Sequence, residues 1–190
     1  MRLCLSFLCG GVKVEYLKYR LYNFLMLVNR NPKRRANLVR FIGVNIGTNC
    51  ELLDRKVQFG SEPYLITIGS NVKITTGVKF ITHDGGVYIF RRLDQYRNID
   101  LFGRISVGSN VFIGNDVTIL PNVTIGNNCV IGAGSIVTRS IPDNSIAAGV
   151  PARVLSTYDE YLTKNLKNFV NTKNLSNKQK KEFLKNRYQL

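Results

Sequence analysis

The chain has 190 residues, 44% of them hydrophobic, which is enough to bury one core of ordinary domain size. Its four cysteines form no CxxC pair and no dense framework, which argues against a disulfide scaffold or a zinc knuckle and favours reduced thiols. The formal net charge of +15 is concentrated at the two ends: residues 1–40 hold nine Lys and Arg against one acid, and residues 151–190 hold nine against three.

Residues 1–40 are predicted to form a basic helical segment. Apolar residues recur there at helical spacing, namely Val14, Leu17, Leu21, Phe24, Leu25 and Val28. We expect Pro32 and the basic residues that follow it to end this helix. The start of the chain lacks the cleavage pattern of a signal peptide. The apolar run of residues 21–28 is shorter than the ~20 residues that span a bilayer. These features predict a cytoplasmic protein without a transmembrane helix.

An aliphatic residue then recurs every six positions. The series is complete at Val107, Ile113, Ile119, Ile125, Ile131 and Val137. An earlier block repeats the scheme at Ile68, Ile74 and Phe80, and Ile46 starts it. A helix repeats near 3.6 residues and a strand near 2, so a period of six fits neither alone. Hexapeptide repeats are typical of a parallel β-helix, in which three repeats make a coil of 18 residues and stacked coils share one core.

Side-chain directions follow from this scheme. We expect the periodic aliphatic residue and the residue four places later to face inward, so that Cys50 and Cys129 fill core positions. Asparagines at the corners would supply permissive backbone angles and local hydrogen bonds; they are Asn110, Asn115, Asn127 and Asn128.

The register breaks once. From Phe80 to Val107 there are 27 residues, which is not a multiple of six, so the chain is predicted to leave the coil as a loop over about residues 83–104. This loop carries His83, which is the one histidine of the chain, beside Asp84, and also Arg91 and Arg92. Loops held by a rigid scaffold often carry the chemistry of a protein.

Beyond the repeats, Ser156 or Thr157 can cap a helix over residues 158–169, and Ser176 can cap a short Lys-rich helix. The chain is therefore predicted to have three parts. They are a basic helical segment (1–40), a repeat domain with its loop (41–154) and a basic helical tail (155–190).

Over roughly residues 42–154 the sequence resembles the hexapeptide-repeat acyltransferases. Three features carry the resemblance: the repeats, a histidine in an extruded loop, and the closing run IGAGSIVTRSIPDNSIAAGVPARV of residues 131–154. The segment FITHDGGVYIFRR is most similar to the polysaccharide O-acetyltransferase branch. The resemblance implies a mainly β protein, a left-handed parallel β-helix with an extruded loop and flanking helices.

The same resemblance implies a homotrimer that binds acetyl-CoA between neighbouring subunits and uses no metal. The motif places the pantetheine arm of acetyl-CoA along Gly114, Asn115, Ala133 and Ala148. The nucleotide end would meet Thr138, Arg139 and Arg153, because phosphates favour cationic donors. Many relatives have lysine where this chain has Arg139.

His83 is the expected general base. Acetyl transfer to a sugar hydroxyl needs a group that takes up the hydroxyl proton, and imidazole suits this task near neutral pH. Either Asp84, its neighbour, or Glu62, about one coil earlier, could hold the other ring nitrogen, and Glu62 could instead contact the acceptor. Arg91 and Arg92 favour an acidic sugar as acceptor.

Other functions agree less well with the sequence. A carbonic anhydrase on this fold needs three histidine ligands for zinc, and the chain has one. A drug, an amino sugar or another small acceptor remains open, as does a non-catalytic β-helix that mediates interactions. Nucleic-acid binding rests on charge alone and is not expected. The basic ends instead suggest either peripheral contact with the anionic inner face of a membrane or attraction of an acidic polysaccharide.

Overall fold

The computed structural model describes the backbone of residues 5–190 and the side chains of residues 17–190. Val14 of the predicted apolar stripe, and Cys4 and Cys9, lie outside the described side chains. The chain divides into two compact units, residues 1–158 and 159–190, which are described separately. Among the described helices, none is both long enough and apolar enough to cross a membrane.

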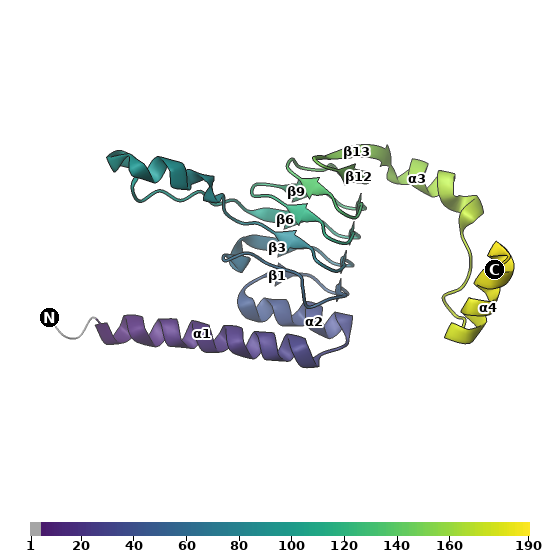
Figure 1. Cartoon of the computed structure of the whole chain (residues 1–190), viewed down its shortest axis with the longest axis horizontal. Helices are drawn as coiled ribbons and strands as arrows, with labels where there is room; N and C mark the ends of the chain where they lie inside the picture. The colour runs from purple at the N-terminus through teal and green to yellow at the C-terminus, as the bar shows by residue number, and fades with distance from the viewer. Residues whose placement is uncertain (1–4) are drawn as a thin grey trace. The chain divides into compact units, whose positions relative to one another are not determined.

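The first unit is built from very short strands that form three sheets (Figure 1). The first sheet contains β1 (Asn45–Ile46), β3 (Ile66–Ile68), β6 (Ile105–Val107) and β9 (Thr124–Ile125). The second contains β2 (Glu51–Leu52), β4 (Lys73–Ile74), β7 (Phe112–Ile113), β10 (Val130–Ile131), β12 (Ser145–Gly149) and β13 (Ala152–Thr157). The third contains β5 (Lys79–Phe80), β8 (Thr118–Ile119) and β11 (Ile136–Val137).

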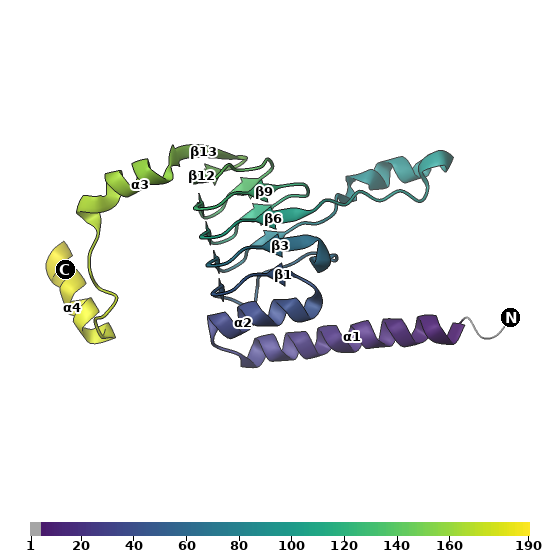
Figure 2. The same ribbon diagram turned by 180° about the vertical axis from the view of Figure 1, so that it is seen from behind.

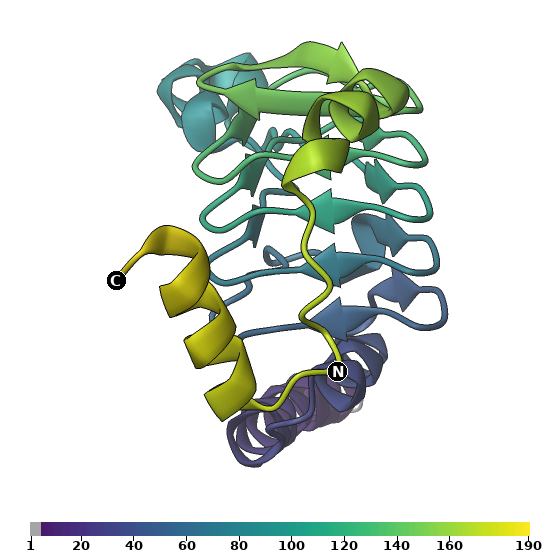
Figure 3. The same ribbon diagram turned by 90° about the vertical axis from the view of Figure 1, so that its right-hand side faces the viewer.

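The chain visits the three sheets in turn, and every strand pair is parallel except β12 with β13. This is the predicted left-handed parallel β-helix. Figure 3 shows the successive coils lying one above another. The register confirms a coil of 18 residues, because Val107 pairs with Ile125 and Ile119 pairs with Val137.

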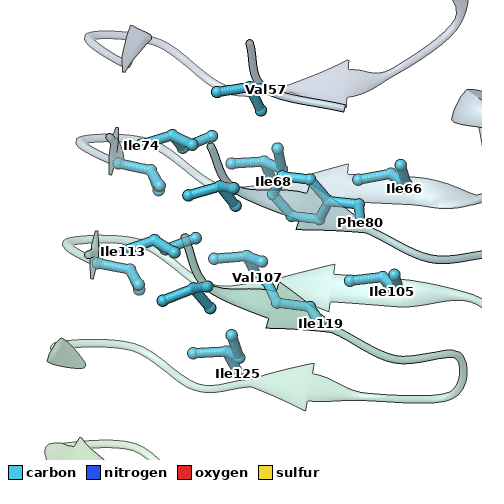
Figure 4. Packing of buried hydrophobic residues seen from close by; sticks show 14 of the residues in the cluster. Val57, Ile66, Ile68, Ile74, Phe80, Ile105, Val107, Ile113, Ile119 and Ile125 are labelled. Atoms are coloured by element: carbon cyan, nitrogen blue, oxygen red, sulfur yellow. The ribbon is translucent and has the colours of Figure 1, made fainter. Parts of the chain in front are cut away.

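The periodic aliphatic residues form one continuous core. Ile113, Ile119, Ile125, Ile131 and Val137 have no exposed surface, and Figure 4 shows side chains from successive coils packed on one another. The two cysteines at inward positions are buried, as predicted. Burial raises the pKa of the Cys129 thiol, so this sulfur is part of the core and a poor nucleophile.

Left-handed backbone angles occur at the corners of the coils. Asn110 and Asn128 have positive φ, as predicted. The same prediction for Asn115 and Asn127 is wrong, because the left-handed angle falls one residue later, at Asp116 and Asn128. Asn127 contributes through its side chain, since its Oδ1 accepts a hydrogen bond from the amide of Ser109 in the coil below. The same turn geometry therefore recurs at these corners, with hydrogen bonds between coils.

Helices cover the open end of the first coil, as Figures 1 and 2 show from opposite sides. They are α1 (Leu5–Val28), α2 (Pro32–Leu38) and the 3-10 turn η1 (Val39–Ile42). Helix α1 ends at Val28, before Pro32 as predicted, but Pro32 and its basic neighbours also begin α2, a helix that was not predicted. Asn31 caps this helix by accepting hydrogen bonds from two backbone amides, and proline suits a first helical position.

The second unit, residues 159–190, contains little regular packing of its own. Helix α3 (Tyr158–Asn165) is shorter than predicted and continues as the 3-10 turn η5 (Leu166–Asn168). Helix α4 (Asn177–Tyr188) begins as predicted after Ser176, whose side chain and that of Gln179 form a capping box. No residue of these helices is buried.

Candidate active site

Two insertions widen the same corner of the β-helix, where the chain passes from the third sheet to the first. The shorter one follows Phe59, and the longer one, residues 83–104 (the His83 loop), follows β5. Phe59 stacks on Phe80 at 5.3 Å between ring centroids, and Gln58 bridges Lys79, so residues 21 positions apart lie in adjacent coils.

Glu62 and His83 are also 21 positions apart. The two insertions therefore present these side chains to one another. Nδ1 of His83 lies 3.2 Å from Oε2 of Glu62. The same oxygen accepts a hydrogen bond of 2.7 Å from Oγ1 of Thr82, a fully buried residue. The carboxylate is thus anchored to the coil, and its contact with Nδ1 leaves Nε2 as the ring nitrogen available to a ligand.

Asp84 has a different role in the geometry. Its Oδ1 accepts a hydrogen bond of 2.8 Å from the amide of Gly86, and so it caps the 3-10 helix η3 (Gly85–Arg92). The structure thus brings Glu62, rather than Asp84, to the imidazole. The two stems of the loop are joined on either side of His83 by hydrogen bonds from the amide of Asp84 to Leu101 and from the amide of Gly103 to Thr82.

The His83 and Glu62 side chains open into a cavity of about 320 Å³. It is lined by Ser61, Glu62, His83, Asp84, Gly85, Arg91, Asp100, Leu101 and Phe102. Arg91 is held in place because its guanidinium pairs with Asp100 and its Nε donates to the carbonyl of Ile99. Arg92 is exposed and is not part of the lining. Of the two arginines predicted to meet an acceptor, only Arg91 therefore lies at the cavity.

The predicted pantetheine residues lie on another corner, between the second and third sheets. There the register aligns Ile113 with Ile131 and Ile131 with Ala147, so the residues that follow each of them lie one above another in successive coils. The amide of Gly134 donates to the carbonyl of Asn115 at 2.7 Å. A Cβ on Gly114 would come within 2.6 Å of the backbone nitrogen of Ala133, so close stacking alone requires glycine here.

The residues of this corner differ in exposure. Asn115 and Ala133 are exposed, Ala148 is half-buried and Gly114 is buried, so a narrow chain that runs along the corner would meet the first three. The pantetheine arm that the resemblance assigns to this corner stays a prediction.

The structure also gives the positions of the residues predicted to bind the nucleotide end of acetyl-CoA. Thr138 and Arg139 follow β11 on the corner that carries His83, and both are exposed. Val137 aligns through Ile119 with Phe80, so Arg139 lies two coils from Thr82, ~10 Å along the axis. Arg153 lies in β13, in register with Ala148, and is exposed. One protomer therefore does not bring the small-residue corner and His83 together, because they lie on opposite edges of the third sheet.

Two features of this site were not predicted from the sequence. They are Thr82 as the residue that anchors Glu62, and Asp100 as the partner of Arg91. The 21-residue offset places Glu62 opposite His83. Thr82 precedes that histidine in the chain, so its contact with Glu62 could be found only with the register of the first coil. Among the described residues, no group of three or more His, Cys, Asp or Glu could hold a metal ion.

The repeats and the site together define a class of protein. The bacterial transferase hexapeptide family, with six repeats, matches residues 104–139. The chain belongs to this family, as its similarity to a curated member of nearly equal length also shows. That relative is Protein CapG of Staphylococcus aureus, which is 51% identical over 167 residues; the match covers 87% of this chain and 94% of CapG.

Solved structures agree with the family. A galactoside acetyltransferase in complex with coenzyme A is 27% identical and matches with a TM-score of 0.59, over 86% of this chain and 88% of that enzyme. A maltose O-acetyltransferase from Clostridium difficile 630 is 29% identical and matches with a TM-score of 0.52, over 77% of this chain and 87% of that enzyme. Both structures are acetyltransferases whose names denote sugars.

Proposed function

We propose that this protein is an acetyl-CoA-dependent O-acetyltransferase that acts on a sugar hydroxyl in the synthesis of a capsule, an exopolysaccharide or a lipopolysaccharide. The observation that carries the proposal is the pair of His83 and Glu62 at an open cavity, on the loop of a hexapeptide β-helix. The galactoside and maltose acetyltransferases support the sugar acceptor.

In this mechanism His83 acts as the general base. Its Nε2 takes the proton of the acceptor hydroxyl while that oxygen attacks the acetyl carbonyl, so that a C–O bond forms. The C–S bond then breaks, and the same nitrogen returns the proton to the departing sulfur. Transfer is direct, without an acyl-enzyme. Glu62 holds Nδ1 and keeps the ring in one orientation, as carboxylates do in catalytic triads.

The other predicted residues have positioning and binding roles. Arg91, held by Asp100, would orient an acidic group of the acceptor at the cavity. Acetyl-CoA supplies the acetyl group, with its pantetheine arm along Gly114, Asn115, Ala133 and Ala148. Its phosphates would meet the exposed residues Thr138, Arg139 and Arg153.

This assignment requires neighbouring copies of the chain. The small-residue corner and His83 lie on opposite edges of the third sheet, so a homotrimer would bring the corner of one copy to the loop of the next. The loop supports contact with a neighbouring copy, since Tyr88, Ile89 and Phe90 are all exposed in the single chain.

An acceptor screen tests the proposal. The purified protein is incubated with acetyl-CoA and neutral sugars, acidic sugars, amino sugars, serine or chloramphenicol, and free thiol is measured. We expect thiol release with a sugar. His83→Ala should reduce release by roughly 10²- to 10⁴-fold while acetyl-CoA still binds.

Asp84→Asn is the matched control, because asparagine also caps the 3-10 helix and the variant leaves His83 and Glu62 in place. This control should keep most of the activity. Full turnover by His83→Ala would refute the role of the histidine, and turnover with chloramphenicol or serine alone would refute the sugar acceptor.

A further inference from the structure

Helix α1 has two apolar sides, and only one of them packs on the β-helix. Tyr22 and Met26 are buried in the core cluster, and Tyr19 packs against it. The apolar stripe that predicts an amphipathic helix points elsewhere. Its members Leu17, Leu21, Phe24 and Val28 are 70%, 47%, 59% and 53% exposed. The stripe that would ordinarily bind the core is therefore the side that the fold leaves open.

This open side forms a groove with a cationic border. Leu17, Leu21 and Phe24 of α1 line it together with Phe41 of η1, and its volume is about 740 Å³. Lys18 and Arg20 complete the lining, and Nζ of Lys18 lies 6.0 Å from the centre of the Phe41 ring. Apolar side chains at the centre with cations beside them are the arrangement of a helix that lies in the interface of a membrane.

The charge of residues 1–40 decides whether a second copy of the chain or a membrane surface occupies this groove. Residues 1–40 hold nine Lys and Arg against one acid. A second copy of α1 would bring the same positive charge against the groove, which is unfavourable. An anionic lipid surface is complementary to that charge and also accepts the apolar side chains. Insertion of α1 across the bilayer is not supported, because no described helix can cross a bilayer.

We propose that the exposed side of α1 docks on a membrane surface that contains anionic phospholipids, with Leu17, Leu21 and Phe24 inserted among the lipids. The cations beside the groove, and the exposed Arg30 and Arg34 that follow the helix, would lie at the level of the head groups. This inference does not depend on the acetyl transfer proposed above, and an inactive protein could still show it.

Sedimentation with vesicles tests the proposal on the full chain. One set of vesicles contains phosphatidylcholine alone, and the other contains equal parts of phosphatidylcholine and phosphatidylglycerol. We expect the protein to sediment with the second set, and added salt to weaken binding without removing the contribution of the apolar side chains. Absence of sedimentation with anionic vesicles would overturn the proposal.

A triple variant separates apolar insertion from charge. Leu17→Ser, Leu21→Ser and Phe24→Ser together should lower the affinity for anionic vesicles by at least ~10-fold, because each removes an apolar side chain from the lipid. The matched control is Leu162→Ser, Leu166→Ser and Phe169→Ser, which changes the same three residue types at exposed positions of the second unit. This control should bind as the unmodified protein does.

Two further readouts keep the test decisive. Circular dichroism and gel filtration of each variant report folding and assembly, and the single variant Leu21→Ser serves if the triple variant fails to fold. Equal binding by the α1 variant and the unmodified protein would overturn the proposal. A smaller oligomer for the α1 variant would do so as well, because a second copy would then be the occupant of the groove.

Discussion

The stacked coils and the His83 loop are built in opposite ways. In the coils, side chains such as Ile113, Ile119 and Ile131 have no exposed surface, and every six residues repeat the same environment. In the loop, the 3-10 helix η3 has no buried residue, and Tyr88 and Ile89 are each 64% exposed. The coils thus supply rigidity and the loop supplies reactive groups, so substitutions in the first should cost stability and substitutions in the second should cost activity.

The contact between the two regions is narrow. Hydrogen bonds at Thr82, Asp84, Leu101 and Gly103 join the loop stems, and Thr82 is fully buried in the coil. Glu62 bridges the regions, because its carboxylate accepts from Thr82 on one side and meets His83 on the other. The position of the imidazole is therefore set by the coil, although the histidine itself stands in the loop.

Among substitutions that distinguish the coils from the loop, Ile119→Ala should cause the largest loss of stability. Ile119 pairs with Phe80 below and Val137 above and has no exposed surface, so its truncation would leave a cavity between three coils. We expect a loss of about 2–5 kcal/mol in the free energy of unfolding, measured by urea denaturation. Ile89→Ala in the loop is the control and should change this free energy by less than ~0.5 kcal/mol. Equal losses would contradict the division between coil and loop.

Glu62→Gln tests the bridge between the regions. Glutamine keeps an oxygen that can accept from Thr82, but it removes the charge beside His83. We expect kcat to fall roughly 10- to 100-fold, less than the loss of a general base costs, with KM for acetyl-CoA and the unfolding free energy unchanged. Steady-state kinetics with the acceptor found in the screen would check this. A rise in KM at constant kcat would mean that Glu62 binds substrate instead of orienting the ring.

The packing of α1 on the coil end should show in the dependence of stability on pH. Burial, with a smaller contribution from Tyr19, raises the pKa of Tyr22 from 10.0 to about 12. The folded state thus holds this proton more tightly than the unfolded state. The resulting stabilisation is complete below pH 10 and is lost as the pH rises from 10 to 12.

At pH 11 the loss should be about 1 kcal/mol, and Tyr22→Phe should lack it. Urea denaturation at pH 9 and pH 11, compared between the two proteins, measures the difference. An identical pH response in Tyr22→Phe would argue that α1 does not pack on the coil through this side chain.

Asn128→Ala should have the smallest effect. Asn128 donates to Asn144 and accepts from Asn110 on the surface of one corner, and its φ is 54°. We expect a loss of up to about 1 kcal/mol from the exposed hydrogen bonds and the unfavourable angle. Asn128→Gly loses the same hydrogen bonds but tolerates the angle, so it should be the more stable of the two. Thermal denaturation would rank them, and the reverse order would refute the role assigned to the angle.

The sequence predicts the coils better than the site, for a physical reason. A repeat of six residues constrains each inward position in the same way, so the core residues and the 18-residue coil follow from spacing alone. Insertions carry no such constraint. The choice between Asp84 and Glu62 stayed open because it depended on how many residues the first coil contains, and that number is 21 or 22 at different strands instead of 18.

Helix α1 shows the same limit. Its apolar stripe correctly predicted a helix, since periodicity is a local property, but not which side meets the core. The same holds for α2, where Pro32 was interpreted as a stop signal although, after the cap Asn31, it also starts a helix.

The amino-acid sequence by itself thus determined the period, the inward residues, the existence of the loop and the histidine that it carries, because each depends on neighbours along the chain. Only the tertiary structure decided that Glu62 meets His83, that Arg91 but not Arg92 reaches the cavity, and that Leu17, Leu21 and Phe24 remain exposed. These contacts join segments whose separation depends on inserted residues and on the packing of one element against another, and neither is encoded in a local pattern.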